Sequence, residues 1–201
     1  MKLFLSAGHT NIEGQDRGAF GNGKWEGDLT VEFRDILIAE LKQLGINPIT
    51  DNNKNALSQT LAYFKALTNT DSLVIDIHFN SSENKDVHGT EVYIPEISSD
   101  YEKQVGAHIS ELIAAGLKTR NRGIYPESVS AHKRLGWMRL IGENILIEIC
   151  YISNYSDMFS YENSKSKLAK DLAKYLASVI SVPEKQPDLM ESNFKPKFMP
   201  V

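Results

Sequence analysis

Hydrophobic positions along the chain alternate between short apolar runs and longer stretches with helical spacing. The short runs are rich in β-branched or aromatic residues and predict strands at 3–7, 46–50, 73–79, 89–94 and 145–152. The longer stretches repeat apolar residues every three or four positions and predict helices at 27–44, 56–67, 101–117 and 164–180. This alternation predicts an α/β fold, a sheet layered by helices.

Two segments lack these periodic patterns. Residues 118–144 carry no sustained periodicity and predict a loop-rich region. Residues 182–201 contain Pro183, Pro187, Pro196 and Pro200 in a polar context, which predicts an extended or disordered tail. The alternative for this tail is a segment that docks on a partner or on the chain's own surface. We therefore expect one catalytic domain over 1–181 and a tail over 182–201.

Composition is that of a globular protein rather than of a nucleic-acid or membrane binder. The 201 residues are 41% hydrophobic and 24% charged, which is enough to bury a sizeable core. The formal net charge of −4 and the absence of a long Lys or Arg run give no electrostatic reason to expect nucleic acid or a membrane surface as a partner.

Signals for export or membrane insertion are not evident in the sequence. No apolar stretch is long enough to span a bilayer, and no hydrophobic signal region precedes the first predicted strand. We therefore expect synthesis in the cytoplasm and no membrane insertion. The single cysteine, Cys150, lies in an apolar run, so we expect a buried thiol and no intramolecular disulfide.

Two candidate ligand residues lie near the amino terminus. His9 follows the first predicted strand in Ser-Ala-Gly-His-Thr, where small residues allow close approach of the backbone. Glu26 precedes Leu29 by three residues and Phe33 by seven, which places its carboxylate on the buried face if the helix has begun. The alternatives are an ordinary loop histidine and an exposed acidic residue in a first helical turn.

The predicted strand 73–79 carries polar side chains near its end. Period-two alternation puts Asp76, His78 and Asn80 on one side of this strand. A satisfied buried polar network is one explanation. The other is a ligand site, because ligands in open α/β sheets bind at the carboxyl ends of strands.

Glu148 lies within the run Ile-Leu-Ile-Glu-Ile-Cys-Tyr-Ile. An unpaired carboxylate there costs several kcal/mol to bury, and burial raises the pKa of the carboxyl toward the range of a general base. The alternative is a structural ion pair with an arginine such as Arg139.

Two histidines and one glutamate form a familiar open coordination set for catalytic zinc, with a fourth position for water. A second glutamate outside that set can carry a proton from the water to a departing nitrogen. The candidates come from separate elements, so no compact His-Glu-x-x-His signature is present.

Four short segments in this order resemble the zinc-dependent N-acetylmuramoyl-L-alanine amidases of the type-three family. The resemblance runs from about Leu3 to Ile180, and it rests on the order and separation of the four segments together. These segments are Gly8-His9-Thr10, Gly18-Ala19-Phe20-Gly21-Asn22-Gly23 leading to Glu26-Gly27-Asp28-Leu29, Asp76-Ile77-His78-Phe79-Asn80, and Glu148-Ile149-Cys150-Tyr151-Ile152-Ser153-Asn154.

The resemblance implies that His9, Glu26 and His78 bind one zinc ion and that Glu148 is the catalytic glutamate. It also implies a single domain with a mixed, mostly parallel sheet flanked by helices on both faces. Asn80 would contact substrate, and the glycines from Gly18 to Gly27 would form a flexible approach to Glu26.

The sequence departs from the family pattern at Cys150, where a small or polar residue is common. His132 and Trp137 lie in a region that varies among these enzymes. His88, His108 and His132 fall outside the matched segments, so we leave all three out of the metal site.

The resemblance predicts hydrolysis of the amide between the lactyl group of N-acetylmuramic acid and L-alanine, with peptidoglycan as substrate. The absence of an export signal and of a wall-binding repeat suggests an endolysin, a bacteriolytic enzyme released to the wall by another protein. Two alternatives stay open: a zinc peptidase cutting another amide of the stem peptide, and a wall-binding module without activity.

Overall fold

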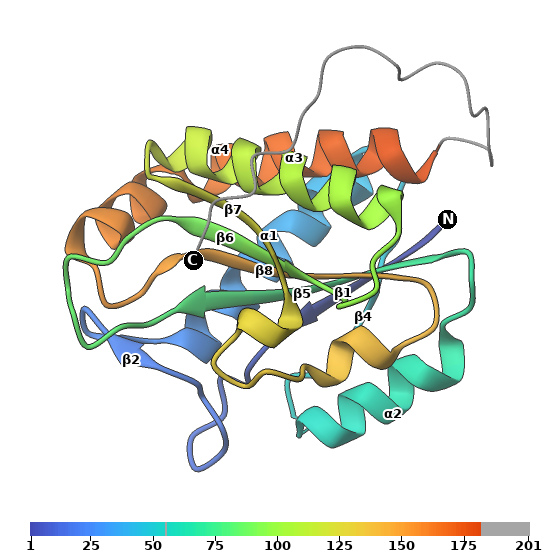
Figure 1. Ribbon diagram of the computed structural model, residues 1–201, viewed down its shortest axis with the longest axis horizontal. Coiled ribbons are helices and arrows are strands. Elements are labelled where there is room, and N and C mark those ends of the chain that lie inside the picture. The colour runs from blue at the N-terminus through green and yellow to red at the C-terminus, as the bar shows by residue number, and fades with distance from the viewer. Residues whose placement is uncertain (55, 182–201) are drawn as a thin grey trace.

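The computed structural model describes residues 1–54 and 56–181, in which strands and helices alternate along the chain (Figure 1). The strands are β1 (Lys2–Ala7), β2 (Phe20–Gly21), β3 (Lys24–Trp25), β4 (Ile49–Thr50), β5 (Ser72–Asn80), β6 (Thr90–Ile94), β7 (Asn121–Pro126) and β8 (Glu143–Tyr151). The helices are α1 (Glu26–Gln43), α2 (Leu57–Leu67), α3 (Asp100–Leu117), α4 (Tyr155–Ile180) and the short 3-10 helices η1 (Glu127–Val129) and η2 (Gly136–Arg139).

Six strands form one sheet in the order β4-β1-β5-β8-β6-β7. Neighbouring strands are parallel except for the pair β6 and β8. β6 and β7 therefore run opposite to the other four strands. The carboxyl ends of β1, β5 and β8 consequently meet the amino ends of β6 and β7 at one edge of the sheet. The mixed, mostly parallel sheet that the sequence resemblance implies is confirmed.

Helices cover both faces of the sheet, as expected (Figure 1). One face packs against α1, α3 and α4 around the larger hydrophobic cluster. On α1, residues four apart point into this cluster, because a spacing of four keeps them on one side of a helix. These residues, Leu29, Phe33, Leu37 and Leu41, are at most 2% exposed.

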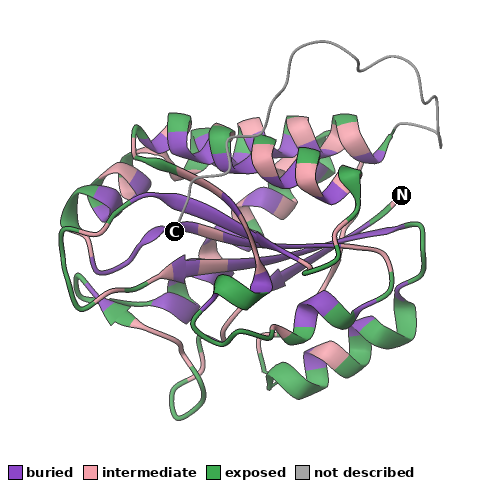
Figure 2. Cartoon of the chain, in the orientation of Figure 1, coloured by how far each residue is buried: buried purple, intermediate pink, exposed green. Residues whose placement is uncertain are grey.

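The other face of the sheet is covered by α2 and η2. Phe64 of α2 and Trp137 of η2 pack edge to face, with ring centres 5.4 Å apart, over Phe4 and Leu146 of the sheet. Figure 2 shows the strands buried between the two helical layers, with exposed positions on the outer sides of the helices. The smaller cluster leaves the end of this face open, and the candidate site lies there.

Most predicted elements are confirmed, with boundaries that move by one to three residues. The expected helix from 164 begins nine residues earlier, at Tyr155, because Asn154 caps it by accepting a hydrogen bond from the Asp157 backbone N–H at 2.9 Å. The expected loop over 118–144 is wrong in part, since it contains β7 and both 3-10 helices.

The glycine-rich approach to Glu26 contains a hairpin, β2 paired with β3, that the sequence interpretation missed. Its two-residue turn places Asn22 at φ 47° and Gly23 at φ 76°, the left-handed conformation that an Asn-Gly hairpin turn requires. Asn22 also donates through its side chain to the Ile152 carbonyl at 2.7 Å. The approach is therefore tied to the end of β8.

Cys150 is fully buried in the larger cluster, and burial raises the pKa of its thiol well above the usual range. Within the described chain, none of the helices combines the length and the hydropathy needed to cross a membrane. The tail expected over 182–201 lies outside the described residues.

Candidate metal centre

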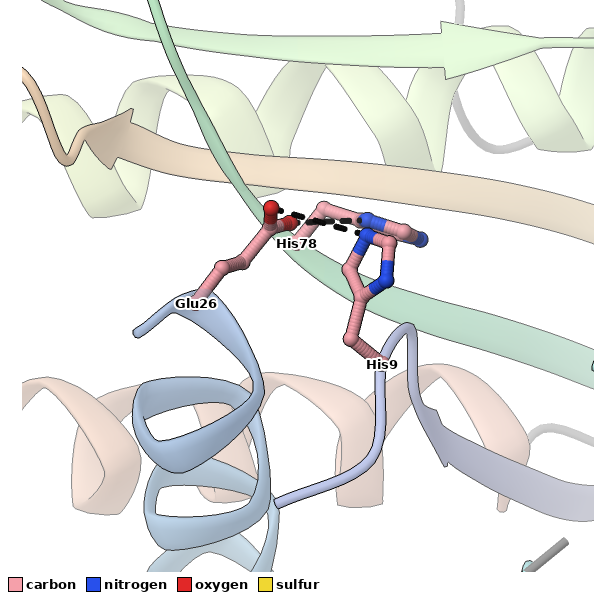
Figure 3. A group of neighbouring side chains, drawn as sticks. All are labelled: His9, Glu26 and His78. Atoms are coloured by element: carbon pink, nitrogen blue, oxygen red, sulfur yellow. Dashed lines mark hydrogen bonds and ion pairs between the residues drawn. The ribbon is translucent and has the colours of Figure 1, made fainter. Parts of the chain in front are cut away.

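Three side chains from separate elements converge at the sheet edge where β1 and β5 end (Figure 3). His9 lies in the loop after β1, Glu26 is the first residue of α1, and His78 lies near the end of β5. One ligand atom from each side chain lies within 4.8 Å of the other two. The structure thus brings together the three residues that the resemblance implies as metal ligands.

The start of α1 is fixed by backbone contacts with the loop that carries the site. The N–H groups of Glu26 and Gly27 donate to the carbonyls of Ala19 at 2.8 Å and Arg17 at 2.9 Å, which satisfies two helix donors that have no partner within α1. A Cβ at Gly27 would lie 2.0 Å from the Thr10 carbonyl oxygen. Glycine at this position therefore allows the His9–Thr10 loop to approach α1.

The Glu26 carboxylate points into the protein, as its helical position predicted, and is 5% exposed. It accepts hydrogen bonds from the backbone N–H groups of Ala19 at 3.0 Å and Phe79 at 3.1 Å. Burial opposes its ionisation, but the hydrogen bond to His78 and the charges of His78 and His9 outweigh burial and lower the Glu26 pKa. Glu26 is therefore held as a carboxylate.

His78 is held between two carboxylates. Its Nδ1 lies 3.0 Å from Glu26 Oε1, and its Nε2 lies 3.0 Å from Asp76 Oδ2. Burial alone would lower the His78 pKa, but Asp76 and Glu26 together raise it well above the ordinary value. Asp76 is fully buried, so it fixes the ring with Nδ1 toward Glu26.

His9 completes the group from the other side of Glu26. Its Nε2 lies 3.5 Å from Glu26 Oε2, and its Nδ1 lies 3.3 Å from Asp16 Oδ1. The rings of His9 and His78 are nearly perpendicular, at 85°, with centres 5.0 Å apart. Both imidazoles therefore direct one nitrogen toward the same carboxylate.

Glu148 lies on β8 directly beside His78 in the register of the two parallel strands. Burial raises its pKa to about 8, and the positive charge of His78 only partly opposes this. Its Oε2 atom is buried and has no hydrogen-bond partner among residues 1–54 and 56–181. The alternative of an ion pair with Arg139 is wrong, because Arg139 Nη2 donates to Glu127 Oε1 at 2.5 Å.

Asn80 has a different environment from the one expected. Its side-chain Nδ2 donates to Glu91 Oε1 at 2.6 Å, and its Oδ1 accepts from the Ser81 backbone N–H at 2.8 Å. The sequence interpretation overlooked Glu91, which is 3% exposed and lies opposite Glu148 in β6. A substrate contact by Asn80 stays a prediction.

The remaining histidines lie outside the group, as expected. His88 and His132 are exposed, and His108 is exposed on α3, where its ring stacks on Tyr175 at 4.1 Å between centres. A groove of about 650 Å³ opens beside His9. Its lining includes Thr10, Gln15, Asn53, Gln59 and Trp137.

The donor set fits a catalytic zinc ion. Two ligands that each lie about 2.0–2.1 Å from a tetrahedral ion are roughly 3.4 Å apart. One ligand atom from each of the three residues lies within 4.8 Å of the other two, and the shortest contacts are 3.0 Å from His78 Nδ1 to Glu26 Oε1 and 3.5 Å from His9 Nε2 to Glu26 Oε2. Imidazole nitrogens and a carboxylate suit zinc, and binding of the metal would release the proton that His78 carries in the metal-free protein. A histidine that binds zinc commonly donates its other ring N–H to a carboxylate, and Asp76 is placed to accept it from His78.

Space around the donor set is tightly shaped. A Cβ at position 18 would lie 2.5 Å from Glu26 Oε2 and 2.6 Å from the His9 ring. The loop backbone therefore closes on the two side chains from outside and leaves no room for a side chain there.

Comparison with known proteins identifies the family. The family model of N-acetylmuramoyl-L-alanine amidases matches residues 3–178. The chain belongs to this amidase family. Over 164 residues it is 30% identical to the protein YqiI of Bacillus subtilis strain 168, covering 77% of this chain and 72% of YqiI. It is also 26% identical over 157 residues to the N-acetylmuramoyl-L-alanine amidase LytC of the same strain. This match covers 77% of this chain and 30% of LytC.

The fold of the amidase chain is also found in solved structures. The N-acetylmuramoyl-L-alanine amidase AmiC2 of Nostoc punctiforme superposes with a TM-score of 0.73 at 20% identity, covering 90% of this chain and 98% of AmiC2. At that identity the likeness concerns the fold. Family membership assigns the chain to the peptidoglycan amidases as an enzyme class.

Proposed function

We propose that this amidase hydrolyses the amide between the lactyl group of N-acetylmuramic acid and L-alanine of the stem peptide, using one zinc ion held by His9, Glu26 and His78. The observation that carries the proposal is the convergence of these three ligand atoms within 4.8 Å. Glu148, on the strand next to His78, supplies the proton carrier. Family membership supports the choice of peptidoglycan as substrate.

When bound, zinc in a three-ligand site polarises the amide carbonyl and lowers the pKa of an adjacent water. The chain's own residues prepare this site. Glu26 is kept anionic by its two backbone donors and by the two histidines. Asp76 accepts from His78 Nε2, so that Nδ1 is the nitrogen available as ligand.

Glu148 accounts for the proton balance of the reaction. Its carboxylate accepts a proton from the attacking water, whose oxygen bonds to the carbonyl carbon. It then delivers that proton to the alanine nitrogen as the carbon–nitrogen bond breaks, giving a lactyl carboxylate and a free amino terminus. Burial raises the pKa of Glu148 in the metal-free chain toward the neutral range, in which a carboxyl group can both accept and release a proton.

Mass spectrometry of purified peptidoglycan after digestion tests the cleaved bond. We expect stem peptides with a new free L-alanine amino terminus after digestion by the wild-type protein with zinc, and none after digestion by Glu148→Gln. New termini at a different amide would show instead that the protein is a peptidase acting within the stem peptide. Absence of any cleavage on several wall types would replace it with a binding module.

The endolysin setting is a separate part of the proposal. We expect purified protein to clear a turbid suspension of isolated cell walls, and Glu148→Gln to leave the turbidity unchanged. Cleavage of soluble wall fragments without clearing of whole walls would contradict a bacteriolytic role and leave the bond assignment intact.

A further inference from the structure

Ionisable side chains form a row across four neighbouring strands, beginning at the candidate metal centre. His78 of β5 pairs with Glu148 of β8, and Glu148 pairs with Glu91 of β6. The next strand, β7, contributes Arg122, which contacts Glu91. Residues paired directly across strands project from the same face of a sheet. The row therefore leads from His78 to the edge strand β7.

A β-bulge places Arg122 in this row. Thr90 of β6 pairs with Asn121 of β7, but the next pair joins Glu91 to Gly123. Arg122 is thus the extra residue of the bulge. Bulges redirect a side chain that regular alternation would place elsewhere, and they occur often beside active sites.

Glu91 holds the arginine firmly. Oε1 of Glu91 accepts from Asn80 Nδ2 at 2.6 Å and from the Tyr93 hydroxyl at 2.8 Å. Oε2 of Glu91 accepts from Nε of Arg122. The guanidinium carbon also lies 5.4 Å from the centre of the Tyr151 ring, within the range of a cation–π contact.

The outer end of Arg122 remains available. A guanidinium has five N–H donors, and Arg–carboxylate pairs are frequently bidentate. Here the hydrogen bond to Glu91 uses Nε alone, and neither terminal nitrogen has a hydrogen-bond partner within the described part of the chain. The Arg122 side chain is 25% exposed, whereas that of Glu91 is 4% exposed. The terminal nitrogens are therefore the donors of this partly exposed side chain that are left for an anion from outside the row.

From this arrangement we propose that Arg122 binds a carboxylate of the stem peptide. The inference rests on the proposed function, which places the scissile amide between the metal centre and Glu148. Strands are spaced about 4.8 Å apart, so the edge strand β7, three spacings away, lies about 14 Å from β5. An extended peptide spans about 3.3–3.6 Å per residue. Carboxylates from the second residue to the end of the stem peptide therefore lie at a suitable distance.

The competing explanation is that Arg122 only neutralises Glu91 and anchors β7. In that case the arginine contributes to stability, and the protein does not distinguish a carboxylate from a carboxamide in the ligand. The two explanations therefore differ in ligand selectivity, which a change in stability does not mimic.

Binding of synthetic muropeptides to zinc-loaded Glu148→Gln protein tests the proposal without turnover. Three ligands are compared by calorimetry: one with both carboxylates free, one amidated at the second residue, and one amidated at the carboxyl terminus. We expect amidation at one of these positions to weaken binding about tenfold, which identifies the carboxylate. Adding Arg122→Gln should bring all three dissociation constants within a factor of about two.

Two further variants guard against loss of structure. Arg122→Lys retains the positive charge, so we expect a reduced but measurable preference for the free carboxylate. Arg139→Gln removes an arginine that also pairs with a buried glutamate but lies outside the row, and it should leave the preference unchanged.

Equal binding of all three ligands in the presence of Arg122 would overturn the proposal, as would a preference that survives in Arg122→Gln. Absence of binding by every ligand would overturn it as well. The cleavage assay decides the proposed function separately, because cleavage of the muramyl–alanine amide without carboxylate selectivity contradicts the role of Arg122 alone.

Discussion

The two faces of the sheet differ in how completely helices cover them. Under α1, α3 and α4 the buried residues form one continuous hydrophobic cluster. Under α2 and η2 the cluster is smaller, and the end of the face carries His78, Glu148 and Glu91 instead. Burial of apolar surface stabilises the fold wherever it occurs, whereas charged groups are tolerated only where partners or water compensate them. One face therefore contributes mainly stability, and the open end of the other is suited to chemistry.

The largest expected effect comes from breaking the chemistry of the open face. Glu148→Gln removes the proton carrier and keeps the shape of the side chain, so we expect kcat/KM on a muropeptide to fall by about 10²–10⁴-fold. The rate is measured by chromatography of the released peptide. Zinc content by mass spectrometry serves as the control and should match that of the wild type. A variant retaining more than about a tenth of the activity would remove Glu148 from this role.

On the covered face we expect a substitution to lower stability and to leave activity unchanged. Leu172→Ala on α4 removes a side chain that is fully buried, and we expect a loss of about 2–5 kcal/mol in the free energy of unfolding. Urea unfolding measures this loss, and the muropeptide assay on the folded variant should give an unchanged kcat. Lys167→Ala on the same helix, at an exposed ion pair with Asp171, should change stability by only a few tenths of a kcal/mol.

A smaller effect is expected from Asp76, the residue that orients the candidate ligand His78. Asp76→Asn weakens the orientation of His78, so we expect zinc affinity to fall about 10–100-fold. Competition against a zinc-binding dye measures this affinity. Asp171→Asn on α4 is the control and should bind zinc as the wild type does. Unchanged affinity in Asp76→Asn would show that His78 does not depend on this carboxylate.

The smallest effect concerns the pH dependence of stability in the metal-free protein. Glu148 releases its proton near pH 4.5 when unfolded and near pH 8 when folded. The folded state retains the proton between these values, so this group's contribution to stability falls as pH rises from 4.5 to 8. Glu148→Gln has no titrating group at this position, so it does not lose this stability as the pH rises.

We therefore expect Glu148→Gln to gain on the order of 1–3 kcal/mol over the wild type between pH 5 and pH 8. Urea unfolding of both proteins at the two pH values measures the difference. An equal difference at pH 5 and pH 8 would contradict a raised Glu148 pKa.

The sequence predicted best those features that depend on residues close together in the chain. Glu148 stands out because apolar residues surround it on both sides, and Glu26 lies at helical spacing from Leu29 and Phe33. Both positions could be interpreted locally. Asn22-Gly23 is also a local signal for a hairpin, and it was overlooked.

Other features depend on partners that are remote in the chain. Glu91 sits in a short strand where alternation alone is compatible with a solvent-facing residue, and only the pairing of β6 with β8 places it opposite Glu148. Arg122 joins the row through a bulge, which arises from the register between β6 and β7. Sequence periodicity indicates which face of a sheet a side chain takes, but it does not identify the residue opposite it on a strand that is remote in the chain.

Anomalous diffraction at the zinc edge, from crystals grown with zinc, tests the central claim most directly. We expect one strong peak within bonding distance of His9 Nε2, the Glu26 carboxylate and His78 Nδ1, with Asp76 still bonded to His78 Nε2. Loss of the peak in a Glu26→Ala crystal would confirm the ligand set. A peak elsewhere, or no peak while Glu26 still bridges the two histidines, would contradict the assignment of this site as the metal centre.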